Sequence, residues 1–99
     1  MITAAAQRAQ RVRITFKAFA TLGEYLPDEV DGARRSGNQI AIEVEEGTPV
    51  QAVIDRFRLP PGQVHLVLVN GAYVPPAQRA GRALRDGDAL AVWPPIAGG

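Results

Sequence analysis

Length, composition and charge limit this chain to a small protein with one core. Its 99 residues are enough for one modest hydrophobic core and too few for two domains. Eleven basic and ten acidic residues leave a net charge of +1, so no global field favours a nucleic acid or an anionic membrane. The absence of cysteine excludes disulfides, thiolate catalysis and cysteine metal sites within the chain.

The N-terminal segment and the apolar runs bear on location. Residues 1–11 show no amphipathic period and lack the long apolar stretch of a secretory signal, so we interpret them as a mobile extension. No apolar run approaches the roughly 20 residues that span a bilayer. We therefore expect a cytoplasmic protein that has no membrane partner.

Two elements are expected in the first part of the chain. Apolar and polar residues alternate from Val12 to Ala18, which predicts a strand with one face on a core. The spacing of Thr21 and Glu24 is that of a capping box and predicts a short helix or helical turn, with an apolar side made by Leu22, Tyr25 and Leu26. Pro27 ends that turn.

The next elements are a loop, a second strand and the main helix. Residues 28–38 combine two glycines and several charges with no apolar period, so we expect a surface loop. Alternation from Ile40 to Glu45 predicts a strand with an acidic outer face. The start of a helix is predicted by Thr48 as N-cap, followed by Pro49 at the first helical position and Gln51 at the third. Its core stripe is expected to consist of Val50, Val53, Ile54 and Phe57.

Three strands are expected in the last third. The near-continuous apolar run from His65 to Val69 predicts a strand that is covered on both faces and central in the sheet. Asn70-Gly71 predicts a type I′ hairpin turn into a short strand at residues 72–74. Leu84 is the expected anchor of the polar stretch that follows, and a turn at residues 86–88 leads into the final strand at residues 89–93. One helix across one sheet makes the expected fold class α+β.

Internal catalytic sites find little support. His65 is the only histidine, and we interpret it as a structural or surface residue. Ser36, the only serine, lies in the expected loop without a motif that brings a base to it. Glu43, Glu45 and Glu46 fit a solvated strand face and turn better than a cation site. We expect no metal site, no bound cofactor and no enzymatic activity of the chain alone.

The end of the sequence remains as the candidate reactive site. Pro94-Pro95 directly after the last strand removes two backbone donors and favours a stiff, extended exit. Extended over its six residues, the segment 94–99 would reach on the order of 20 Å, far enough to enter the active site of another protein. Gly98 and Gly99 have no Cβ, so this end can pass through a narrow channel.

The reactive group would be the α-carboxylate of Gly99. A free carboxylate is a poor acyl donor, so a partner would have to activate it, for instance as an acyl-adenylate made with ATP. Because the chain has no cysteine, sulfur held on it could only be a C-terminal thiocarboxylate. A terminal Gly-Gly can equally be a frayed end, and the preceding strand and proline pair favour a function.

Three segments together form a family pattern. They are the hairpin Leu68-Val69-Asn70-Gly71, the turn Leu84-Arg85-Asp86-Gly87-Asp88 and the tail Val92-Trp93-Pro94-Pro95-Ile96-Ala97-Gly98-Gly99. In these segments the chain resembles the ubiquitin-like sulfur carriers of the MoaD and ThiS type. The resemblance runs from about Val12 to Gly99 and is closest to the small subunit of molybdopterin synthase, although Trp93 stands where Phe is more usual.

The resemblance implies a fold, a reaction and partners. The fold would be the β-grasp (ubiquitin-like) fold, with one main helix across a mixed sheet of four to five strands. Gly99 would be adenylated by a ubiquitin-activating-like adenylyltransferase that uses ATP, and then converted to a thiocarboxylate with sulfur from a donor protein. A sulfur-accepting enzyme such as the molybdopterin synthase large subunit would bind the tail residues, which are Trp93, Pro94, Pro95, Ile96, Ala97 and Gly98.

Two alternatives to a role in molybdenum or tungsten cofactor synthesis stay open. The sulfur could serve another product, such as thiamine thiazole, cysteine or a specialised metabolite. The chain could instead be a ubiquitin-like modifier that is joined to target lysines through Gly99. In each case we expect a flexible extension at residues 1–11, the β-grasp domain at residues 12–93 and the extended tail at residues 94–99.

Overall fold

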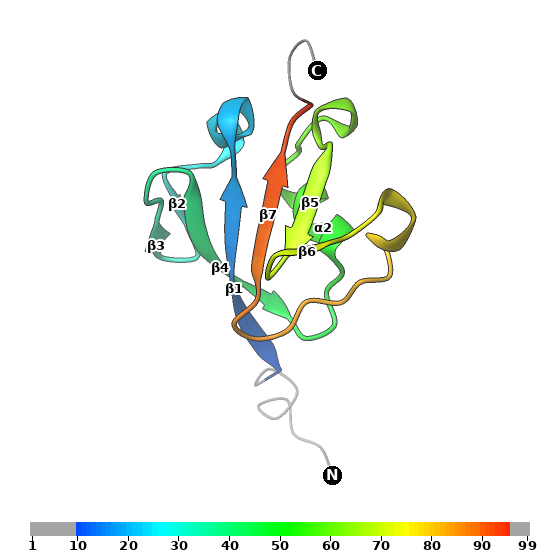
Figure 1. The fold of residues 1–99 in the computed structure, drawn as a ribbon. Helices are drawn as coiled ribbons and strands as arrows, with labels where there is room; N and C mark the ends of the chain where they lie inside the picture. Colours follow the sequence, from blue (N-terminus) through cyan, green and yellow to red (C-terminus); the bar gives the residue numbers. More distant parts are fainter. Residues whose placement is uncertain (1–9, 96–99) are drawn as a thin grey trace.

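A five-stranded mixed sheet and one α-helix make up this computed structural model, which describes residues 10–95 (Figure 1). The strands of the sheet are β1 (Arg11–Ala18), β4 (Gln39–Glu45), β5 (Leu66–Val69), β6 (Ala72–Tyr73) and β7 (Ala89–Trp93). The helices are η1 (Ala20–Tyr25), α2 (Val50–Arg56), η2 (Pro61–Gln63) and η3 (Pro76–Gln78), and β2 (Glu29–Val30) pairs with β3 (Ala33–Arg34) in a separate two-stranded sheet. These elements confirm the predicted α+β class.

The last strand of the chain occupies the middle of the sheet. The strand order is β4-β1-β7-β5-β6, with β1 and β7 parallel and the other neighbours antiparallel. The prediction that residues 65–69 form the central strand is therefore wrong. In β5 only Val67 and Val69 are buried, whereas Leu66 and Leu68 are half-buried on the opposite face. The continuous apolar run reflects an apolar outer face and not coverage on both sides.

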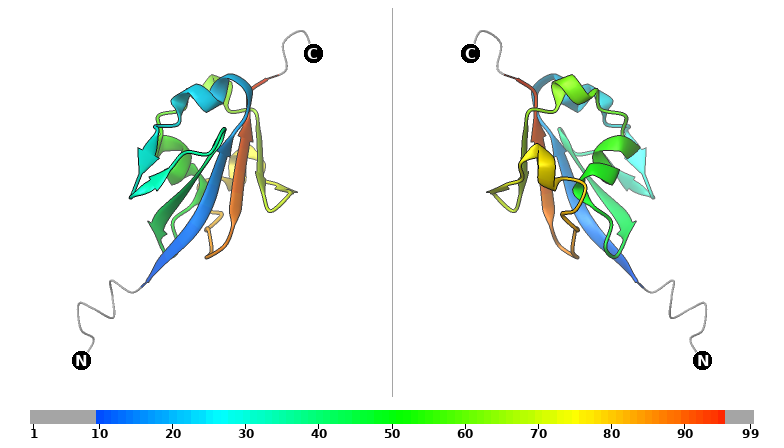
Figure 2. Two further views of the ribbon diagram at one scale, coloured as in Figure 1. Left: turned by 90° about the vertical axis from the view of Figure 1, so that its left-hand side faces the viewer. Right: turned by 90° about the vertical axis from the view of Figure 1, so that its right-hand side faces the viewer.

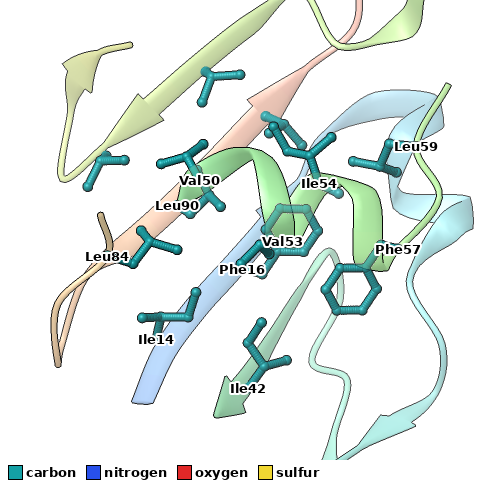
Figure 3. Packing of buried hydrophobic residues seen from close by; sticks show 14 of the residues in the cluster. Ile14, Phe16, Ile42, Val50, Val53, Ile54, Phe57, Leu59, Leu84 and Leu90 are labelled. Atoms are coloured by element: carbon teal, nitrogen blue, oxygen red, sulfur yellow. The ribbon is translucent and has the colours of Figure 1, made fainter. Parts of the chain in front are cut away.

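The core lies between α2 and one face of the sheet (Figure 3). The predicted alternation in β1 is confirmed, because Val12, Ile14, Phe16 and Ala18 are all buried. The rings of Phe16 and Phe57 stack with centroids 4.8 Å apart, which joins β1 to the end of the helix. The expected helix stripe is confirmed as well, and it consists of Val50, Val53, Ile54 and Phe57.

Both predicted helix caps are wrong. The segment Ala20–Tyr25 forms a 3₁₀ helix without a side-chain cap, and Tyr25 is 43% exposed. The helix α2 begins one residue after Pro49, and the Thr48 hydroxyl donates to the carbonyl of Glu45. The first amides of α2 are instead satisfied by tertiary contacts, since Val50 N donates to Arg82 O and Gln51 N to Arg79 O.

The predicted surface loop at residues 28–38 contains a small hairpin, β2–β3. Asp31 and Gly32 have φ values of 52° and 81°, the positive angles that a type I′ turn requires. Strands of two residues are too short to show an alternation, which is why the sequence pattern did not indicate them.

An ion pair attaches this hairpin to the outer edge of β4. Arg56 Nη2 lies 3.1 Å from Asp31 Oδ2, and Arg56 Nη1 donates to the carbonyl of Glu43 at 3.3 Å. The amide of Glu43 donates in turn to Asp31 Oδ2 at 3.4 Å. The hydrogen bond from Arg56 is the main reason why the pKa of Asp31 lies below its ordinary value of 3.8.

The predicted Asn70-Gly71 turn is confirmed, with φ values of 52° and 85°. The turn is also tied to the start of β7. Asn70 Nδ2 donates to the buried Asp88 at 2.8 Å, and Ala89 N donates to Asn70 Oδ1 at 2.9 Å. Leu84 is buried as expected, and the turn at residues 86–88 leads into the final strand.

A buried guanidinium connects the irregular segment after β6 to the start of β5. Arg79 is 6% exposed and donates to three carbonyls, those of Val74 at 3.1 Å, His65 at 3.2 Å and Val64 at 3.5 Å. Within residues 10–95 it forms no ion pair. Its role is therefore to satisfy main-chain acceptors that no strand or helix satisfies.

Replacing Arg56 by Gln should raise the pKa of Asp31 toward 3.8, because the guanidinium is the largest cause of its lowering. A carboxylate whose pKa is lowered by folding stabilises the folded chain above its unfolded pKa, and this stabilisation is lost as the pH falls through the folded pKa. An NMR titration of the side-chain carboxyl carbon measures the shift. Arg58→Gln, which removes an exposed arginine outside the ion pair, is the control. An unchanged pKa in Arg56→Gln would contradict the assignment.

Replacing Arg79 by Met should lower the free energy of unfolding by about 2–4 kcal/mol, because three carbonyls lose their donor. Arg79→Lys should cost less, since an ammonium still reaches some of these acceptors. Chemical denaturation measures both values. Arg85→Met, at an exposed arginine, should stay within about 0.5 kcal/mol of the parent chain. Equal stabilities of Arg79→Met and Arg85→Met would refute the role of Arg79.

Candidate functional site

The structure describes three of the seven residues predicted to act at the end of the chain. Trp93 is the last residue of β7, Pro94 is half-buried and Pro95 is exposed. The others, Ile96, Ala97, Gly98 and Gly99, lie outside the described residues. The described part of the site is therefore the end of β7 together with the proline pair that follows it.

Hydrogen bonds hold this strand end from both sides. Phe19 N donates to Val92 O at 3.0 Å, and His65 N donates to Trp93 O at 2.9 Å. Pro94 has no N–H, so the ladder ends there. Figure 1 shows the chain leaving the sheet at the end where η1 and η2 lie. The exit point is thus fixed by the neighbours of β7 on each side.

An aromatic pair lies next to the exit point. The rings of Phe19 and Trp93 stack with centroids 4.3 Å apart and planes 2° apart. Phe19 follows Ala18, the cross-strand partner of Val92, so the parallel register places Phe19 opposite Trp93. Phe19 is not recognisable from the sequence, because only the pairing of β1 with β7 indicates its position.

The face of the sheet opposite α2 carries a row of apolar side chains. Figure 2 shows α2 on one side of the sheet, and within residues 10–95 no helix covers the other side. The register places Trp93 beside Leu66, Ala91 beside Leu68, and Leu68 beside Tyr73, all on this face. We call these residues together with Phe19 the open-face strip. It extends from the exit point to Tyr73, which is 55% exposed.

His65 contributes to the site through its backbone. Its carbonyl accepts from Arg79 and its amide donates to Trp93, so it links the buried guanidinium to the strand end. The residue as a whole is exposed, which confirms the interpretation as a structural or surface residue. Arg79 was missed, because nothing in its local sequence indicates three distant carbonyl partners.

Two depressions lie on the surface of the domain. One, of about 470 Å³, lies between η1 and η2 and includes Glu24 as its one titratable carboxylate. The other, of about 550 Å³, is lined by Arg82, Arg85 and Asp88 among others, and Asp88 is already bonded to Asn70 and to the amide of Arg85. Neither combines a nucleophile with a base.

Metal-binding clusters and membrane-spanning helices are absent from the described part of the chain, residues 10–95. Among residues 10–95, no group of three or more histidine, cysteine, aspartate or glutamate side chains is placed to hold a metal ion. In the same residues, no helix has the length and apolarity needed to cross a membrane.

Solved structures with a similar fold include the following three proteins. The solution structure of the Haloferax volcanii HVO 2177 protein has 27% identity and a TM-score of 0.64, with 91% of this chain and 89% of that chain covered. A putative molybdopterin converting factor subunit 1 from Pyrococcus furiosus has 23% identity and a TM-score of 0.59, with 86% and 99% covered. The crystal structure of SAMP1 from Haloferax volcanii has 23% identity and a TM-score of 0.56, with 88% and 99% covered.

Sequence comparison identifies the family. No curated protein matches the chain in sequence. The model of the ThiS family, by contrast, matches residues 28–99, which is well over half of the chain. The five-stranded mixed sheet with one main helix is the β-grasp, ubiquitin-like fold of the similar structures. The chain therefore belongs to the ThiS family, the MoaD and ThiS type of ubiquitin-like sulfur carrier, whose members work with partner enzymes.

Proposed function

We propose that this protein carries sulfur as a thiocarboxylate on Gly99 and donates it in molybdenum or tungsten cofactor synthesis. The observation that carries the proposal is the family match, which runs through the tail to Gly99. The strand end adds physical support, because β7 is held on both sides up to the residue before Pro94. The name of the Pyrococcus furiosus protein, a molybdopterin converting factor subunit, favours this pathway over others.

The chemistry requires an activating partner. An oxygen of the Gly99 carboxylate attacks the α-phosphorus of ATP, and pyrophosphate leaves to give an acyl-adenylate. A hydrosulfide ion delivered by a donor protein then attacks the acyl carbon and AMP leaves, which gives the thiocarboxylate and a proton without a change in oxidation state. Transfer of this sulfur to an acceptor, with water supplying the oxygen, regenerates the carboxylate. In this proposal, ATP is bound and consumed by the activating enzyme.

The chain itself contributes presentation. The strand end is fixed by two hydrogen bonds and by the stacked ring of Trp93. The proline pair restricts φ near −65° directly after it, so fewer conformations have to be given up when an enzyme binds the tail. The protein is in this proposal the small sulfur-donating subunit of an enzyme complex and has no activity alone.

A second candidate function is protein modification, which the similarity to SAMP1 favours. The activated Gly99 would then be transferred to a lysine amine of a target protein, with loss of AMP and formation of an isopeptide bond. Lys17 is the only lysine of this chain, so lysine-linked chains of this protein would have one linkage site.

Incubation with ATP, the cognate adenylyltransferase and a sulfur donor should increase the intact mass by the difference between sulfur and oxygen. Deleting Gly99 should reduce this product and the sulfur transfer to background, without a change in thermal stability, because the buried core lies within residues 12–92. Gly62→Ala is the control, since a Cβ at Gly62 meets no atom within 4 Å. Full sulfur transfer by the deletion variant would refute the carrier role, and isopeptide adducts would favour the modifier.

A further inference from the structure

The charges on the open face are not equivalent. The outward residues of β1 include Arg11, Arg13 and Lys17, since the alternate positions are buried. Arg11 is in register with Glu45 of β4, and Arg13 with Glu43. Carboxylates directly opposite offset these two positive charges.

Lys17 has apolar and neutral neighbours instead. Its cross-strand partners are Gln39 of β4 and Ala91 of β7. It is half-buried, and within residues 10–95 it forms no ion pair. Trp93 lies two residues beyond Ala91 on the same face, so this ammonium borders the open-face strip close to the exit point.

Continuity with the tail argues that a partner enzyme covers this surface. The open-face strip ends at Trp93, one residue before the proline pair. Under the proposed function, an enzyme that binds the segment after Pro95 lies next to Trp93 and Phe19. Apolar side chains arranged in a row beside such a segment add contact area that the short tail alone does not provide.

We propose that Lys17 determines which adenylating enzyme binds this protein. The enzyme covers the open-face strip with a surface that is otherwise apolar, and one carboxylate on that surface pairs with the ammonium of Lys17. This inference rests on the proposed function. An ammonium enclosed by an apolar partner without a counter-charge is costly, so the partner has to supply an acidic side chain there. A partner with an apolar or basic residue at this position is rejected.

Charge also disfavours a second copy of this chain as the occupant. A symmetric pair of strips would enclose two Lys17 ammonium groups in one apolar interface, and the strip contains no carboxylate to offset them. An acidic partner surface has no such conflict. Charge complementarity therefore favours the enzyme over self-association.

The test is ATP–pyrophosphate exchange by the cognate adenylyltransferase, with this protein as the varied substrate. Lys17→Glu should raise KM about tenfold and change kcat by less than about twofold, because Lys17 acts in docking and lies away from the reacting carboxylate. Lys17→Arg should stay close to the parent protein. Arg58→Glu makes the same change in net charge at an exposed arginine after α2 and should leave both constants unchanged. Added salt should reduce the difference in KM between the parent protein and Lys17→Gln, because salt screens the ion pair that this variant lacks.

The outcomes separate the two proposals. If the parent protein supports exchange and Lys17→Glu behaves like Arg58→Glu, the role of Lys17 is overturned while the proposed function stands. A loss confined to kcat, or sedimentation that shows self-association through this face, overturns it as well. If the parent protein supports no exchange and gains no sulfur, the proposed function fails and the docking role fails with it. Thermal unfolding of each variant checks that the fold is retained.

Discussion

The pairing of β7 with both β1 and β5 is the constraint on which the rest of the structure depends. The last strand lies parallel to the first and antiparallel to β5, so it has hydrogen-bonded neighbours on each side. Every element between β1 and β7 has to be placed without occupying that central position. The helix α2 crosses one face, and β4 and β6 take the two edges. The chain therefore leaves from the middle of the sheet, where the backbone is held most firmly.

Side chains stabilise the parts of the fold that have little regular structure. The stretch between β6 and β7 contains one short 3₁₀ helix, and many of its carbonyls and amides have no ladder partner. Near one end of the stretch, Arg79 donates to the carbonyl of Val74 and to two carbonyls that precede β5, and Asp88 with Asn70 closes the other end. The same stretch supplies the carbonyls that receive the first amides of α2. A small number of polar residues thus connects α2, the β5–β6 hairpin and the central strand β7.

Local patterns were sufficient to predict most of the fold. Alternation identified β1 and β4, the apolar spacing identified α2, and Asn70-Gly71 identified the hairpin, because each signal depends only on neighbours along the chain. The position of β5, the missing cap of α2 and the β2–β3 hairpin were not predicted. Each of these depends on a distant segment. Strand β7 takes the central position of the sheet, the carbonyls of Arg79 and Arg82 accept hydrogen bonds from the first amides of α2, and Arg56 forms an ion pair with the hairpin.

Some residues of the candidate site could also be identified from local sequence patterns, whereas others depend on distant segments. Trp93, Pro94 and Pro95 were identified from their order alone, since proline has a fixed effect on the strand that precedes it. Phe19 and the backbone of His65 were not identified. Their contribution exists only because the register brings Phe19 against Trp93 and the amide of His65 to its carbonyl. The partner-binding role of residues 93–98, the reactive role of Gly99 and the domain boundaries stay predictions.

The ion pair between Asp31 and Arg56 has a consequence for the behaviour of the protein at high concentration. The free edge of a sheet is a template for strands of other molecules and promotes aggregation. On β4, both the amide and the carbonyl of Glu43 are already bonded, to Asp31 and to Arg56. On the opposite edge, β6 has two residues and is followed by Pro75 and Pro76. Strand addition is thus hindered at Glu43 of β4 and limited to a short stretch at β6, which favours a dispersed protein over intermolecular sheets.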